Sequence, residues 1–109
     1  MLLCETDYDE QKHNEALKRI QPRNITQVIK EVTAIYLDLY NLTELYQINH
    51  GMCEDFAEDV CRLMPGAIAL WNDEIDPNSP FAHKVILYGR KYYDCECPKG
   101  TRNWRKLMR

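Results

Sequence analysis

Residues 51–66 read GMCEDFAEDVCRLMPG and separate two parts of the chain with different hydrophobic periods. In this stretch the apolar side chains recur three or four residues apart, as in a helix with one buried face. They are Phe56, Ala57, Val60, Leu63 and Met64. Pro65-Gly66 then stops the pattern, because proline cannot continue a helix and glycine commonly follows one. We therefore expect a helix that begins near Cys53 and ends at Met64.

The longest predicted helix precedes this stretch. Apolar side chains recur with a period of 3.6 between Ile25 and Leu39, which indicates an amphipathic helix that ends near Asn41. Asn24 or Thr26 can cap its N-terminus, because either side chain carries an oxygen that accepts a backbone N–H.

Two shorter helical segments flank the long one. Helical spacing favours a helix over about residues 9–20, from the apolar residues Ala16, Leu17 and Ile20. Thr43–Gln47 is expected to add one turn, and Asn49-His50-Gly51 is expected to break it.

After the proline, the period changes to two, which is typical of half-buried strands. Asn72–Pro80 is predicted to be a polar loop, Gly89-Arg90 a two-residue hairpin turn, and Pro98–Gly100 the end of the strands. The expected strands are Ala67–Trp71, Ala82–Tyr88 and Lys91–Cys95. This order predicts an α+β fold in one domain of residues 1–109, with residues 1–22 a candidate for a loosely packed segment.

Composition narrows the class of protein. The chain has 109 residues and a net charge of -3, so one domain is expected and neither nucleic acid nor an anionic membrane is an expected partner. No apolar run approaches the roughly 20 residues of a transmembrane helix, and the acidic start does not resemble a signal peptide. An odd number of cysteines favours reduced thiols in a cytoplasmic protein. They are Cys4, Cys53, Cys61, Cys95 and Cys97.

Cys53 is the candidate nucleophile. It lies two residues after Gly51, at the first turn of the expected helix. Free backbone N–H groups and the positive end of the helix dipole favour a thiolate at that position. The alternative is a buried cysteine that packs as a small apolar side chain.

The hairpin supplies a candidate base and its orienting carboxylate. Its register places Val85 opposite Asp94 and His83 opposite Glu96, so His83 and Asp94 are diagonal neighbours on one face. Diagonal Cβ atoms lie about 7–8 Å apart, which allows the two side chains to pair. Because Val85 and Leu87 share this face, we expect it to pack on the preceding helix. A purely structural pair is the alternative, and after a slip in register Glu96 would orient the histidine instead.

These residues carry a resemblance to a known superfamily. Residues 51–57, Gly-Met-Cys-Glu-Asp-Phe-Ala, resemble the G-x-C-x-D-F-A nucleophile motif of transglutaminase-like proteins. Ala82-His83 and Tyr93-Asp94 resemble that superfamily's histidine and aspartate motifs. Gln47 stands six residues before the cysteine, where papain-like peptidases carry an oxyanion-hole glutamine. The chain looks closest to the small bacterial and phage hydrolases of this superfamily.

The resemblance implies a thiol hydrolase, either a peptidase or an amidase, that acts on a protein or peptide without a cofactor. Cys53, His83 and Asp94 would form its triad, and the substrate would pass through a thioester. The Cys53 backbone N–H and either Gln47 or Asn49 would hold the oxyanion. Two alternatives remain: a transglutaminase or protein-glutamine deamidase with the same triad, and a catalytically silent binding or inhibitor module on the same fold.

A few further residues complete the prediction. His50, Gly51 and Glu96 are candidates to line the cleft. Cys95-x-Cys97 is not expected to bind metal, because its thiols point to opposite faces of a strand and no second pair has zinc-ligand spacing. The basic tail, residues 101–109, is expected to be anchored to the domain by its tryptophan.

Overall fold

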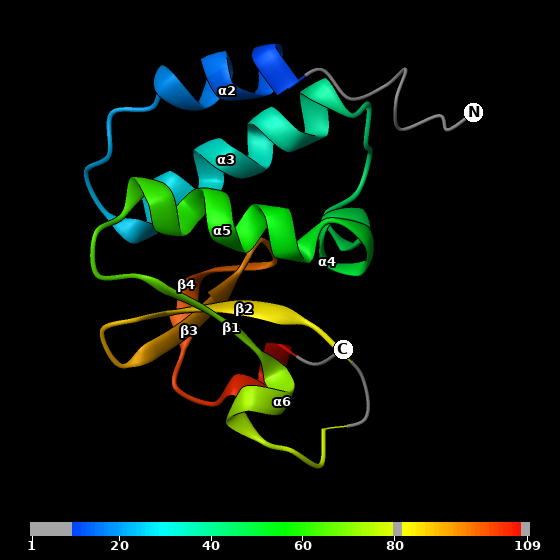
Figure 1. Cartoon of the computed structure of the whole chain (residues 1–109), viewed down its shortest axis with the longest axis vertical. Helices are drawn as coiled ribbons and strands as arrows, with labels where there is room; N and C mark the ends of the chain where they lie inside the picture. The colour runs from blue at the N-terminus through cyan, green and yellow to red at the C-terminus, as the bar shows by residue number, and fades with distance from the viewer. Residues whose placement is uncertain (1–9, 80–81, 108–109) are drawn as a thin grey trace.

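A computed structural model describes residues 10–79 and 82–107. Their helices and antiparallel strands form two layers, with α3 and α5 over one face of the sheet, as the expected α+β class requires (Figure 1). The helices are α2 (Glu10–Lys18), α3 (Ile25–Leu39), α4 (Tyr46–Gly51), α5 (Cys53–Leu63), α6 (Asn72–Ile75) and the 3-10 helix η1 (Trp104–Leu107). The strands are β1 (Ile68–Trp71), β2 (Lys84–Tyr88), β3 (Lys91–Asp94) and β4 (Cys97–Thr101).

The long helix α3 begins at the cap that the sequence suggested. Asn24 Oδ1 accepts the backbone N–H of Gln27 at 2.8 Å, and the Gln27 side chain in turn accepts the backbone N–H of Asn24. This reciprocal capping box satisfies two N–H groups that the helix itself leaves free. The apolar face of α3, which runs from Ile25 to Tyr36, lies in the core with the apolar face of α5.

The chain turns into α5 at Met52 and not at the glycine before it. Asn49-His50-Gly51 was expected to break the helix, but these residues form the second half of α4. Met52 leaves helical geometry at φ -131° and ψ 19°, and its carbonyl accepts the backbone N–H of Phe56 at 2.9 Å. Helix α5 therefore starts at Cys53, as predicted.

The sheet has the strand order β1-β2-β3-β4, and every neighbouring pair is antiparallel. The predicted hairpin register is confirmed where the ladder is formed, since Tyr88 pairs with Lys91 and Leu87 with Tyr92. Gly89 occupies the first turn position with a φ of +64°, a conformation that glycine adopts without steric cost.

Two short elements occupy regions where the sequence predicted none. Cys97–Thr101 pairs with β3 as strand β4, although Pro98–Gly100 was expected to end the strands. Because β4 is an edge strand, Pro98 lacks an N–H at a place where the sheet tolerates that loss. Helix α6 forms inside the predicted polar loop, and its first residue, Asn72, is fully buried.

The sheet face that packs on the helices is the opposite of the expected one. Ile86 belongs to the core cluster with α3 and α5, and Lys84 contacts a carboxylate of α5. Alternate strand residues share a face, so Val85 and Leu87 point to the other side and their expected packing on α5 was wrong. The error arose because His83 precedes β2 and does not follow the alternation of the strand.

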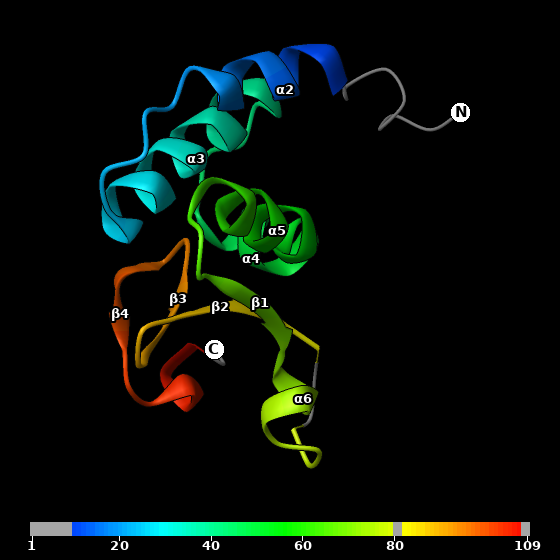
Figure 2. The ribbon, with the colours of Figure 1, turned by 60° about the vertical axis from the view of Figure 1, so that its left-hand side comes forward.

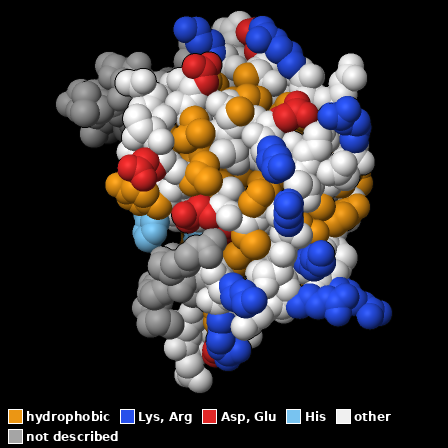
Figure 3. Space-filling model, turned by 180° about the vertical axis from the view of Figure 1, so that it is seen from behind, with side chains coloured by type: hydrophobic (Ala, Val, Ile, Leu, Met, Phe, Trp, Pro, Cys, Tyr) orange, Lys and Arg blue, Asp and Glu red, His pale blue; other side chains and the backbone are white. Residues whose placement is uncertain are grey.

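The sheet face that carries Val85 is covered by η1, which contacts β3 and β4 (Figure 2). Val85 and Leu107 are both buried there. Arg105 pairs with Asp76 at 3.5 Å and stacks over the Trp104 ring, so the described part of the basic tail lies against the domain. Seen from behind, Lys and Arg side chains are scattered from the top of the molecule to its lower edge (Figure 3).

A buried polar cluster joins α2 to the rest of the helical layer. His13 Nε2 lies 2.7 Å from Asp59 Oδ2, and its Nδ1 lies 2.6 Å from the Tyr40 hydroxyl. The Tyr36 hydroxyl and Arg62 also donate to the Asp59 carboxylate. Burial, together with the hydrogen bond to Asp59, raises the pKa of Tyr36. Helix α2 also contributes Leu17 to the core.

No helix in the described ranges is both long and apolar enough to cross a bilayer.

Candidate active site

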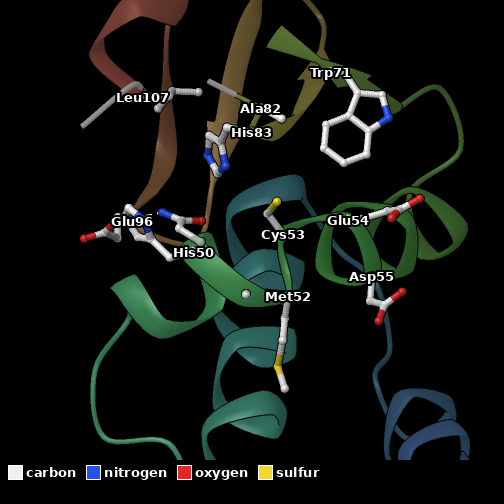
Figure 4. Close-up of a pocket in the computed structure, with 12 residues that line it drawn as sticks. His50, Met52, Cys53, Glu54, Asp55, Trp71, Ala82, His83, Glu96 and Leu107 are labelled. Atoms are coloured by element: carbon white, nitrogen blue, oxygen red, sulfur yellow. Dashed lines mark hydrogen bonds between the residues drawn. The ribbon is translucent and has the colours of Figure 1, made fainter. Parts of the chain in front are cut away.

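Cys53 begins α5 and projects its sulfur toward His83 (Figure 4). The thiol is half-buried, and the polar groups that act on its pKa are the His83 side chain and the backbone N–H of Lys84. Burial acts to raise the pKa of Cys53, but these polar groups and the positive charge of His83 outweigh it. The pKa of Cys53 is therefore lowered from its ordinary value of 9.0. A thiolate is the nucleophilic form of cysteine, so this environment favours reaction.

His83 is fixed through its backbone by a residue that the sequence analysis did not single out. The Asn72 side chain accepts the His83 N–H through Oδ1 at 2.9 Å, and the Asn72 N–H donates to the His83 carbonyl at 2.9 Å. Asn72 Nδ2 hydrogen-bonds to the Ser79 hydroxyl, which fixes the orientation of the amide. The sequence offered one signal: Asn72 is a polar residue directly after an expected strand. If the fold buries such a residue, its amide needs hydrogen-bond partners.

Asp94 orients the imidazole from the end of β3. Its Oδ2 lies 3.1 Å from His83 Nε2, and only 1% of Asp94 is exposed. This bond leaves the other ring nitrogen, Nδ1, for the Cys53 sulfur. Burial alone would lower the pKa of His83, but the hydrogen bonds to Asp94 and Cys53 raise it from 6.5 to about 9. The structure thus brings Cys53, His83 and Asp94 together, with a hydrogen bond between His83 and Asp94 and the Cys53 sulfur directed toward His83 (Figure 4).

Asn49 lies beside these three residues, and its amide nitrogen donates its hydrogens to carboxylates. Its Nδ2 lies 3.3 Å from Asp94 Oδ2 and 2.7 Å from Glu96 Oε1. An amide nitrogen carries two hydrogens, and these two contacts account for both. Asn49 therefore holds Asp94 in place, and the expected oxyanion role does not agree with this geometry.

Gln47 points away from the candidate site. Its Oε1 accepts the backbone N–H groups of Thr43 and Glu44, each at 2.9 Å, and so closes the turn before α4. Gln47 is not among the described residues that line the cavity beside Cys53. The expected oxyanion role of Gln47 is therefore wrong for this structure, because a local turn uses the side chain that the resemblance assigned to substrate.

The thiol opens onto a cavity of about 590 Å³. Trp71 and Glu54 lie on one side of the sulfur, and His50 and Glu96 lie on the other (Figure 4). Gly51 also lines the cavity, and a Cβ added there would meet no heavy atom within 4 Å. The three residues predicted to line a cleft, His50, Gly51 and Glu96, thus all border this cavity.

The cavity wall is acidic. Glu54, Asp55 and Glu96 line it, and no Lys or Arg does so in the described part of the chain. Lys84 lies behind this wall, where its ammonium contacts Glu58 at 2.9 Å and Glu54 at 4.0 Å and stacks over Trp71. The solvent-facing side of the cavity therefore favours cationic groups.

Cys95 and Cys97 do not converge on a common point. Cys95 is buried and donates to Leu45 O and Asn49 Oδ1, each at 3.3 Å, whereas Cys97 is the first residue of β4. Within residues 10–79 and 82–107, no group of three or more His, Cys, Asp or Glu side chains is arranged to hold a metal ion.

Comparison of the chain with known protein families, curated proteins and solved structures finds no match. A function is therefore argued from the site itself, where Cys53 lies beside the hydrogen-bonded His83–Asp94 pair and opens onto a cavity.

Proposed function

We propose that this protein is a thiol hydrolase, a peptidase or amidase of the papain- and transglutaminase-like kind. The observation that carries the proposal is the position of the Cys53 thiol beside His83, which hydrogen-bonds to the buried Asp94, at the wall of a cavity of about 590 Å³ (Figure 4). In such an arrangement a base activates the thiol and a carboxylate orients the base.

Acylation starts from the Cys53 thiolate paired with the His83 imidazolium. The sulfur attacks the carbonyl carbon of a peptide or carboxamide, a C–S bond forms, and the carbonyl electrons move to oxygen. When this intermediate collapses, the C–N bond breaks and the leaving amine takes the Nδ1 proton of His83. The product of this half-reaction is a thioester on Cys53.

Deacylation uses the neutral His83 as a base. Nδ1 takes a proton from water, the water oxygen attacks the thioester carbonyl, and the C–S bond breaks with its electron pair returning to sulfur. Asp94 keeps Nε2 protonated throughout, so the same ring nitrogen, Nδ1, serves as acid and then as base.

Backbone N–H groups at the first turn of α5 are the available donors for the oxyanion. Cys53 is the first residue of that helix, and the first N–H groups of a helix have no partner within it. Each well-placed donor of this kind is worth about 2.7–4 kcal/mol of transition-state stabilisation.

A second candidate is acyl transfer to an amine, as in a transglutaminase. The same thioester forms, and an amine replaces water in the second step. The carboxylates of Glu54 and Asp55 beside the thiol favour binding of a cationic amine. Incubation with casein and a small primary amine, followed by mass spectrometry, separates the two candidates: hydrolysis cleaves or deamidates the protein, whereas transfer adds the mass of the amine.

The test of the proposal is the pH dependence of alkylation by iodoacetamide, mapped to each cysteine by mass spectrometry. Cys61 is a control within the same helix, because burial raises its pKa to about 11. We expect Cys53 to react well below pH 8, much faster than Cys61, and His83→Ala to remove that advantage. If Cys53 reacts as an ordinary thiol and His83→Ala changes nothing, a binding module on this fold is the better description.

A further inference from the structure

Two carboxylates converge on a single amide nitrogen at the inner end of the candidate site. Asn49 Nδ2 lies 3.3 Å from Asp94 Oδ2 and 2.7 Å from Glu96 Oε1. Asp94 is 1% exposed and Asn49 is 9% exposed, so water screens these groups poorly. Of the residues in this group, only Asp94 contacts the imidazole of His83.

The orientation of the Asn49 amide is fixed from its other side. The thiol of Cys95 donates to Asn49 Oδ1 at 3.3 Å, and Cys95 is itself buried. If the Asn49 amide were flipped, its N–H groups would face the thiol and its oxygen would face two carboxylates. The amide oxygen and the carboxylate oxygens are all acceptors, so they would repel one another. Helix α4 and the segment after β3 therefore hold the N–H groups on the carboxylates.

Two neighbouring carboxylates repel each other, and this repulsion would push the Asp94 side chain out of place. A donor that hydrogen-bonds to both carboxylates offsets the repulsion and fixes where each one lies. Asp94 contacts the titratable His83 directly, and it shares the Asn49 amide nitrogen with the Glu96 carboxylate. The backbone N–H of Glu96 also donates to Asp94 Oδ1, at 3.0 Å.

We infer that Asn49 is a positioning residue of the triad: by bridging Asp94 and Glu96 it holds the Asp94 carboxylate against the His83 imidazole, and Asp94 in turn orients His83 toward Cys53. This inference rests on the proposed function, because it assigns Asn49 a role in the same Cys53 site. Asn49 contacts no reacting atom in this role. Glu96 becomes the group against which Asn49 acts, so removing the Glu96 charge should make Asn49 less important.

A double-mutant cycle tests this dependence. The measured quantity is the rate of Cys53 alkylation at pH 6.5 in the wild type, Asn49→Ala, Glu96→Gln and the double variant, with the fold of each checked by circular dichroism. We expect Asn49→Ala to slow alkylation about tenfold in the wild-type background, which corresponds to one pKa unit of thiolate formation. In the Glu96→Gln background the same change should cost less than about threefold, since contacting groups couple.

Equal losses in both backgrounds would show that Asn49 has a structural role only, and no loss in either would exclude the inference. Neither outcome affects the proposed function, which fails instead if the wild type and His83→Ala react at the same slow rate.

A second variant keeps the test open if Asn49→Ala does not fold. Asn49→Asp has nearly the same volume but replaces the donor with a third carboxylate. Cys53 alkylation should then be slower than in the wild type, and Glu96→Gln in the same protein should recover part of the lost rate. An unchanged rate in a folded Asn49→Asp protein, or no recovery with Glu96→Gln, would contradict the inference.

Discussion

Asn72 binds both backbone polar groups of His83, accepting its N–H and donating to its carbonyl, each at 2.9 Å. Asn72 lies at the start of α6, eleven residues before His83, and is fully buried. The position of the candidate base thus depends on a short helix that closes the end of β1.

Asn72→Ala tests this dependence. The change leaves the buried His83 N–H without an acceptor, which typically costs about 1–3 kcal/mol. We expect a lower free energy of unfolding in urea and slower Cys53 alkylation. Ser79→Ala is the matched control, because it removes only the partner of the Asn72 amide hydrogens and should have the smaller effect on both measurements. Equal effects of the two variants would argue against a special role for the Asn72 oxygen.

The raised pKa of His83 predicts how stability depends on pH. The folded protein holds the His83 proton up to about pH 9, whereas the unfolded chain releases it near 6.5. The stabilisation is therefore complete below about pH 6.5 and is lost as pH rises through about 9, with a size of up to about 3 kcal/mol. The difference in unfolding free energy between the wild type and His83→Gln should shrink over this window. A difference that stays constant from pH 6 to pH 9.5 would contradict the assigned pair.

The acidic cavity predicts selectivity for the charge of a thiol reagent. Cationic methanethiosulfonate reagents should modify Cys53 faster than anionic ones, by about tenfold at low salt, because cations concentrate near carboxylates and anions are repelled by them. Salt should reduce the ratio. Glu54→Gln with Asp55→Asn should reduce it further, since both carboxylates line the cavity. The same ratio measured at Cys97 is the control, and equal ratios at the two cysteines would count against the prediction.

The buried His13–Asp59 pair predicts that α2 is an integral part of the domain. His13→Ala removes one partner of a carboxylate that is 1% exposed, and should lower the free energy of unfolding by about 2 kcal/mol or more. Glu15→Ala, an exposed change in the same helix, should have little effect. Hydrogen exchange of the α2 amides would report whether α2 alone loosens or the whole domain does.

Gly51→Ala should stabilise the protein. Gly51 lies in helix α4, and a methyl group there meets no heavy atom within 4 Å. Alanine is favoured over glycine inside a helix by about 0.8–1 kcal/mol. A loss of stability would show that the close of α4 needs glycine for its backbone.

The local features of the fold could be predicted from the sequence. The start of α5, the cap of α3 and the hairpin register follow from spacing, capping chemistry and turn residues that lie close together in the chain. Cys53, His83 and Asp94 were predicted to meet, and they do. The helix start, the cap and the register needed only the helix or hairpin in which the residues lie. The meeting of Cys53 with the hairpin was expected from the resemblance and from a sheet face that the structure reverses.

The parts that were not predicted depend on contacts between distant segments. The Gln47 side chain could hydrogen-bond either to a substrate or to the backbone of its own turn. Only the folded chain shows that it bonds to the turn. Asn72 acquires its role through a residue on the far side of a loop. Pro98 is compatible with a strand only because that strand lies at an edge, which the sequence does not reveal.

Cys53 belongs to the helical layer, whereas His83 directly precedes strand β2 of the sheet and Asp94 ends strand β3. The lowered pKa of the thiol therefore exists only while the two layers are joined. A chain whose layers have separated carries an ordinary cysteine, even if α5 is still helical. The labelling rate of this single sulfur near neutral pH thus reports whether the helical layer is in contact with the sheet. It reports partial opening of the domain before any loss of helix is visible to spectroscopy.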